Sequence, residues 1–184
     1  MIARLAAVAL FVAWPLQALD DAARLSVQDT RNAALEPVAR ALSNHSRTAL
    51  ALAAAAGLVA GGGARAVAIE AVVALVPVNL AVEGLKRATF RTRPDGQRKR
   101  SNAAFPSSHA ANAFAVATVL ARRWRRAALP AFALAAAVAW SRVYLDRHWL
   151  SDVTAGAALA IALTLAVLRW WDARRRPKDV PATA

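Results

Sequence analysis

The chain has 184 residues, 58% of them hydrophobic, and carries a formal net charge of +13 without a single cysteine. The lack of cysteine excludes disulfide scaffolds and cysteine-ligated metal sites. A charge this large points to nucleic acid, an anionic membrane surface or an anionic substrate, and several long apolar runs argue against nucleic acid. The length suits one domain, residues 1–184.

The first apolar run extends from Leu5 to Leu19. It is about 15 residues long, which is short for the roughly 20 residues that cross a bilayer. Two interpretations stay open for residues 1–19: a first transmembrane helix, which we favour, or a cleaved signal peptide. Residues 20–47 are polar, with apolar residues at near-helical spacing, and predict an amphipathic segment at the membrane interface. A soluble loop is the alternative for this segment.

Five more apolar runs follow, at residues 48–60, 66–84, 109–121, 127–145 and 153–168. Only a glycine turn, Gly61 to Gly63, separates the first two, which predicts a helical hairpin. No run alternates with the period of a β-strand, and helices are the ordinary way to cross a membrane. We therefore predict an all-α bundle of six transmembrane helices, or five if residues 1–19 are cleaved.

Basic residues in the short connections predict the orientation of the bundle. The basic positions that fall on one side, expected to be cytoplasmic, are Arg4, Arg65, the arginines between 122 and 126, and the tail at 169–184. The connections on the other side are 20–47, 85–108 and 141–152. Connection 85–108 is strongly basic although it lies on the outer side, and anion binding would explain this. The sequence predicts a multi-pass inner-membrane protein whose site faces the periplasm or exterior.

The outer connections contain groups that suit a phosphate. Lys86 and Arg93 supply a point charge and a planar fork that match phosphate oxygens. Ser107 or Ser108 can cap a helix that begins near His109. The first amides of such a helix, together with its dipole, form an anion seat.

A histidine and an aspartate form the second feature of these connections. His148 and Asp152 are four residues apart, so on a helical turn they face each other. A carboxylate bonded to one imidazole nitrogen fixes the tautomer and frees the other nitrogen as a nucleophile. Arg142 lies six residues earlier, at the outer end of its run. An interfacial pair that closes a helix end is the alternative interpretation.

Together these segments resemble the type 2 phosphatidic acid phosphatase family, the membrane branch of a superfamily that includes vanadium haloperoxidases and bacterial acid phosphatases. The family carries three motifs, K-x6-R-P, P-S-G-H and S-R-x5-H-x3-D. The matching positions, in the family order, are Lys86 to Pro94, Pro106-Ser107-Ser108-His109, and Ser141-Arg142 with His148 and Asp152. Ser108 departs from the family's glycine; it keeps the backbone N–H, but its Cβ would narrow the approach of a bulky headgroup. Asp146 also stands where a small residue is expected.

The resemblance implies a metal-independent lipid phosphatase without a cofactor. His148 would attack phosphorus and form a phosphohistidine, Asp152 would orient it, and His109 would protonate the leaving oxygen. The groups implied to hold the non-bridging oxygens are Lys86, Arg93, Arg142, Ser107 and Ser108. Five further basic residues would bind a larger headgroup or interfacial lipid phosphates: Arg87, Arg91, Arg98, Lys99 and Arg100.

The implied partners are the bilayer and a lipid phosphate, with no nucleic acid. Phosphatidic acid, phosphatidylglycerol phosphate, undecaprenyl diphosphate and a lipid A phosphate all suit the basic connection. Three alternatives stay open: a lipid phosphotransferase with the same intermediate, a vanadium haloperoxidase, and a non-enzymatic membrane protein. The multiple spans argue against the haloperoxidase.

Overall fold

The computed structural model describes the backbone of residues 2–97 and 103–175 and the side chains of residues 16–97 and 103–175. This part of the chain is helical, with no strand among the described residues. The helices are α1 (Ile2–Asp29), α2 (Leu35–Ala60), α3 (Gly62–Thr89), α4 (Ser108–Arg123), α5 (Ala128–Tyr144) and α6 (Leu150–Arg175), with a short 3₁₀ turn, η2 (Arg125–Ala127), before α5. The prediction of an all-α fold is confirmed.

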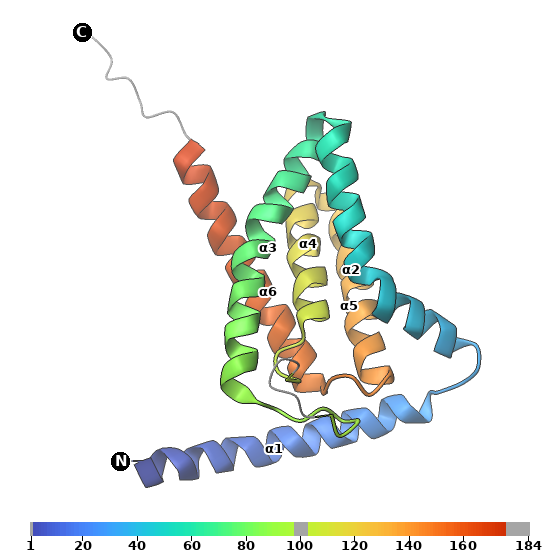
Figure 1. The fold of residues 1–184 in the computed structure, drawn as a ribbon, viewed down its shortest axis with the longest axis vertical. Helices are drawn as coiled ribbons and strands as arrows, with labels where there is room; N and C mark the ends of the chain where they lie inside the picture. The colour runs from blue at the N-terminus through green and yellow to red at the C-terminus, as the bar shows by residue number, and fades with distance from the viewer. Residues whose placement is uncertain (1, 98–102, 176–184) are drawn as a thin grey trace.

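Helix α4 is the centre of the bundle, and α2, α3, α5 and α6 pack around it (Figure 1). Its buried face consists mostly of small residues: Ala110, Ala111, Ala113, Ala115, Ala117, Thr118 and Val119. Small side chains let helix backbones approach closely, which favours helix association in a membrane. Val78 and Val82 of α3 and Ala160 of α6 pack against this face, with Phe114 filling the space beside them.

Three of the described helical segments are long and apolar enough to cross a membrane: α3, η2 with α5 (Arg125–Tyr144), and α6. Helix α4 has 16 residues. At 1.5 Å per residue that is about 24 Å, less than the roughly 30 Å hydrocarbon core of a bilayer. Each of the six predicted spans thus corresponds to a helix. Within the described residues, three of these helices qualify as membrane spans by length and composition alone.

Helix α1 lies across one end of the bundle instead of alongside the other helices (Figure 1). It is one helix of 28 residues, so the first apolar run and residues 20–29 belong to a single element. A turn follows, and α2 then continues without a break past Pro37, which stands in its first turn, where proline is tolerated. The interfacial location of residues 20–47 and the role of residues 1–19 stay predictions.

The connections gather at the two ends of the bundle (Figure 1). Helices α2 and α3 form the predicted hairpin, and Gly61 and Gly62 have φ of 77° and 54°, which glycine adopts without strain. At the opposite end the α3–α4 and α5–α6 connections lie against α1. Of the predicted tail, residues 169–175 continue α6, and residues 176–184 lie outside the described part of the chain.

Candidate active site

Ser107 fixes where the central helix begins. It is the N-cap of α4, and its hydroxyl accepts a hydrogen bond from the amide of Ala110 at 3.5 Å. Its own amide donates to the carbonyl of Asp152 at 3.0 Å, which ties the start of α4 to the start of α6. Ser107 is fully buried. The buried side chain therefore acts as a helix cap. The amides of Ser108 and His109 are the first in the helix and have no partner within it.

Helix α6 touches this cap at a glycine. A Cβ placed on Gly156 would lie 2.6 Å from the carbonyl oxygen of Ser107 and 3.5 Å from the amide nitrogen of Ala111. Contacts between a Cβ and backbone at 2.6 Å do not occur without displacement. Gly156 thus sets how closely α6 approaches the beginning of α4.

A polar cavity of about 380 Å³ opens beside the first turn of α4. Its walls come from α2, α4, α5 and the two connections: Ser43, Asn44, Arg47, Arg93, Ser108, His109, Arg142, Arg147 and His148. Five predicted site residues lie on these walls: Arg93, Ser108, His109, Arg142 and His148. The other three, Lys86, Ser107 and Asp152, are buried. The structure thus brings together residues as far apart in the sequence as Ser43 and His148.

His148 and Asp152 face each other, as their spacing predicts. Nδ1 of His148 lies 3.6 Å from Oδ2 of Asp152, which is longer than a hydrogen bond. That same oxygen accepts from the amide of Trp149 at 2.9 Å, and Oδ1 accepts from Nη1 of Arg91 at 2.7 Å. Because Nδ1 faces Asp152, Nε2 is the ring nitrogen that remains for the cavity.

Burial keeps His148 neutral. It lowers the pKa of His148 from 6.5 to about 4; Asp152 opposes this shift, while the positive charges of Arg142 and Arg93 add to it. At pH 7 the imidazole is therefore uncharged. An uncharged imidazole with a free ring nitrogen is the form that can attack phosphorus.

Positive charge is concentrated on and behind the cavity wall. The side chains of Arg93 and Arg142 are buried, and Nη1 of Arg142 donates to the hydroxyl of Ser43. The Nε of Arg142 is buried without a hydrogen-bond partner among the described residues. Lys86 lies deeper, and its ammonium donates to the carbonyl of Ala103 at 2.6 Å. The cavity can therefore stabilise an anion of more than one negative charge.

Four lining residues are not anticipated by the motifs. Ser43, Asn44 and Arg47 come from α2, and Arg147 comes from the α5–α6 connection, where it pairs with Asp95 at 3.2 Å. The polar stretch 43–47, directly before an apolar run, is the signal in the sequence that marks the α2 residues.

Arg91 also differs from its predicted role as a headgroup binder. Its guanidinium points inward and contacts two carboxylates, Asp20 and Asp152. The predicted headgroup residues Arg98, Lys99 and Arg100 lie outside the described residues.

Comparison with known proteins identifies the family of this chain. The model of the PAP2 superfamily matches residues 67–176, which include every predicted site residue. A lipid A 1-phosphatase of Porphyromonas gingivalis is 37% identical over 75 residues, which cover 39% of this chain and 16% of that protein.

Two crystal structures share the fold. A PAP2-type phosphatidylglycerolphosphate phosphatase from Bacillus subtilis has a TM-score of 0.69 at 21% identity, with 90% of each chain covered. LpxE from Aquifex aeolicus has a TM-score of 0.69 at 20% identity, with 79% of this chain and 92% of that chain covered. Because the matched region takes in more than half of the sequence and holds both histidines of the cavity, this membrane protein belongs to the PAP2 superfamily.

Proposed function

We propose that the protein is a membrane lipid phosphatase that passes the phosphoryl group of its substrate to His148 and then to water. One observation carries the proposal: a neutral, buried histidine backed by Asp152 shares a cavity with Arg93 and Arg142. A nucleophile, an orienting carboxylate and fixed positive charge are the parts that phosphoryl transfer needs.

In the first step Nε2 of His148 forms a bond to phosphorus as the bond from phosphorus to the lipid oxygen breaks. Arg93, Arg142 and the first amides of α4 hold the non-bridging oxygens, whose charge shifts in the transition state. Burial and the charge of Arg142 lower the pKa of His109 to about 3, and the negative charge of a phosphate bound beside it would oppose this shift. His109, in the first turn of α4, then protonates the leaving oxygen. The lipid alcohol, or the lipid monophosphate when the substrate is a diphosphate, then departs.

In the second step water attacks the phosphohistidine. His109, which is now neutral, takes a proton from this water as the bond between phosphorus and nitrogen breaks. Inorganic phosphate leaves, and the original protonation states are restored. Asp152 stabilises the positive charge that develops on His148.

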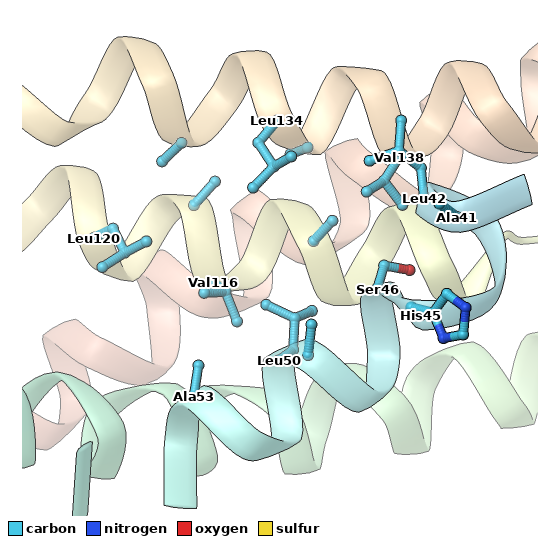
Figure 2. A pocket seen from close by; sticks show the side chains of 15 residues that line it. Ala41, Leu42, His45, Ser46, Leu50, Ala53, Val116, Leu120, Leu134 and Val138 are labelled. Atoms are coloured by element: carbon cyan, nitrogen blue, oxygen red, sulfur yellow. The ribbon is translucent and has the colours of Figure 1, made fainter. Parts of the chain in front are cut away.

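An apolar groove beside the cavity supports a lipid as the substrate (Figure 2). It measures about 450 Å³ and runs between α2, α4 and α5, with walls such as Leu50, Val116 and Leu134. It begins one helical turn from the cavity, because Ala113 follows His109 by four residues and Val138 precedes Arg142 by four. A hydrocarbon chain in this groove would continue from a phosphate held in the cavity.

The names of the relatives support the same class of substrate, since one is a lipid A 1-phosphatase and another a phosphatidylglycerolphosphate phosphatase. Phosphatidic acid, phosphatidylglycerol phosphate, undecaprenyl diphosphate and a lipid A phosphate are the candidates. The distribution of basic residues favours an inner-membrane protein whose cavity opens to the periplasm or the cell exterior.

The test uses the full chain, purified in detergent, against this panel of lipids with EDTA present. We expect phosphate release without added metal from at least one lipid, and none from the His148→Ala variant, which should remain folded. Equal turnover by the parent protein and His148→Ala would overturn the proposal. Transfer of phosphate to a second lipid or alcohol, with no inorganic phosphate released, would instead identify a phosphotransferase with the same intermediate.

A further inference from the structure

Helix α1 presents a polar stripe to the segment that carries His148. Asp20, Arg24 and Gln28 follow one another at four-residue spacing, so they share one face of the helix. Arg24 and Gln28 donate to Oδ1 of Asp146 at 2.6 Å and 3.1 Å. Asp146 has a φ of 54°, which is uncommon for a residue other than glycine. The contacts with Arg24 and Gln28 hold it in this conformation.

Asp20 holds the other end of the same segment. One of its oxygens accepts from the amide of Ser151 at 2.7 Å, and the other accepts from the Ser151 hydroxyl at 2.6 Å. The carboxylate is 1% exposed. A charge with so little water around it requires a partner of opposite charge, and Arg91 Nη2 supplies one at 2.6 Å.

Arg91 connects Asp20 to the active site. Its second terminal nitrogen, Nη1, lies 2.7 Å from Oδ1 of Asp152 and 2.6 Å from the hydroxyl of Ser151. A guanidinium is planar and presents its donors at fixed angles, so it can serve two carboxylates at once. Occupying Oδ1 leaves the other oxygen of Asp152 turned toward His148.

We propose that Asp20 and Arg91 are positioning residues for the His148–Asp152 pair, which makes α1 part of the active-site scaffold. Asp20 keeps the Arg91 side chain against Asp152 and away from the anion in the cavity, which would otherwise attract it. Neither residue touches the substrate. The inference rests on the proposed function, since it assigns a role in that reaction.

The first experiment compares two neighbouring aspartates of α1 in the full chain. Asp20→Asn should lower kcat roughly ten- to hundred-fold, by analogy with the loss of groups that orient metal ligands. KM should stay unchanged, because the cavity wall is intact. Asp21→Asn is the matched control: Asp21 is exposed and contacts Gln17 at 3.1 Å, so its kcat should equal that of the parent protein.

A double variant shows whether the effect passes through Arg91. Arg91→Lys keeps the charge beside Asp20, but one ammonium cannot span both carboxylates, so kcat should fall as in Asp20→Asn. If both residues act along one path, Asp20→Asn combined with Arg91→Lys should be no slower than the slower single variant. Multiplied losses, or a normal kcat in Asp20→Asn, would overturn the inference.

Folding is checked by size-exclusion elution and by the thermal midpoint of each variant. Should Asp20→Asn fail to fold, Ser151→Ala tests the same connection, because it removes only the hydroxyl shared by Asp20 and Arg91. A normal kcat in Ser151→Ala would then count against the inference. If the parent protein is active and His148→Ala is inactive, the proposed function stands whatever the Asp20 and Arg91 variants show. An inactive parent protein would overturn both the proposed function and this inference.

Discussion

The two histidines of the cavity have separate tasks that single substitutions can distinguish. His109 is proposed to protonate the leaving oxygen, so His109→Gln should lower kcat for an alkyl phosphate by about 10²–10⁴, the usual range for a lost general acid. Nitrophenolate leaves without a proton, so the rate of the initial burst of nitrophenolate from p-nitrophenyl phosphate should change little, although the second step still needs His109. An equal loss in the rate of the first step with both substrates would contradict a role in protonation.

The lowered pKa of His148 gives a second prediction for a single residue. The proposed nucleophile is the neutral imidazole, and with a pKa of about 4 it persists well below pH 6.5. We therefore expect protonation of His148 to lower kcat/KM only as the pH falls through about 4. The measurement is the pH dependence of kcat/KM, corrected for the second ionisation of the phosphate monoester at about pH 6. A decline centred near 6.5 after that correction would contradict the burial argument.

Among the helices, α6 contacts the cap of α4 at Gly156, where an added Cβ would come closer to its neighbours than at any other glycine. Gly156→Ala would force a Cβ to 2.6 Å from the carbonyl of Ser107, so the helices must separate. We expect a loss of about 1–3 kcal/mol of stability, typical of overpacking, together with lower phosphatase activity. Thermal unfolding and phosphate release measure the two effects.

Gly84→Ala is the matched control for this substitution. A Cβ on Gly84 meets nothing within 4 Å, and the residue lies in a helix. Stability should be unchanged or higher, because alanine is the better helix former. A similar loss in both variants would show that the contact with Ser107 is not the cause.

The groove between α2, α4 and α5 predicts a difference between long and short substrates. Ala53 lines the groove from α2, so Ala53→Trp should fill it (Figure 2). For a long-chain lipid phosphate, KM should rise at least about ten-fold, the scale on which apolar pockets discriminate by one methylene. A short-chain phosphate should be unaffected. Ala51→Trp, on an exposed position of the same helix, is the control, and an equal effect there would refute the groove.

For the molecule as a whole, the orientation in the membrane can be tested because the chain contains no cysteine. Gln97 lies at the cavity end and Ala64 beside the hairpin turn, and both are exposed. In intact spheroplasts, an impermeant maleimide should label Gln97→Cys but not Ala64→Cys. Both should react after lysis. The reverse pattern would place the cavity on the cytoplasmic side.

Much of this organisation is predictable from the sequence because it depends on local patterns. Apolar runs give the helices, and the spacing of His148 and Asp152 gives their mutual orientation. That Arg93 and Arg142 lie near the histidines is predicted from the resemblance of their motifs to those of the family.

Contacts between distant segments are not predictable in this way. Nothing near Asp20 in the sequence indicates that it meets Ser151, since the contact depends on α1 lying across the bundle. The sequence does not explain a charged residue at Asp146, whereas the structure shows that it pairs with Arg24. Lys86 and Ser107 match their motifs, yet their depth behind the cavity follows only from helix packing.

The position of α1 has a consequence for how the protein is made. Ser151 and Asp20 are 131 residues apart, and Asp146 and Arg24 are 122 apart, yet each pair is in contact. During synthesis, the polar stripe of α1 therefore has no partners until nearly the whole chain has been made. The proposed catalytic pair, His148 and Asp152, is complete only when α6 has emerged, so a nascent chain that stops short of that helix would hold no working site.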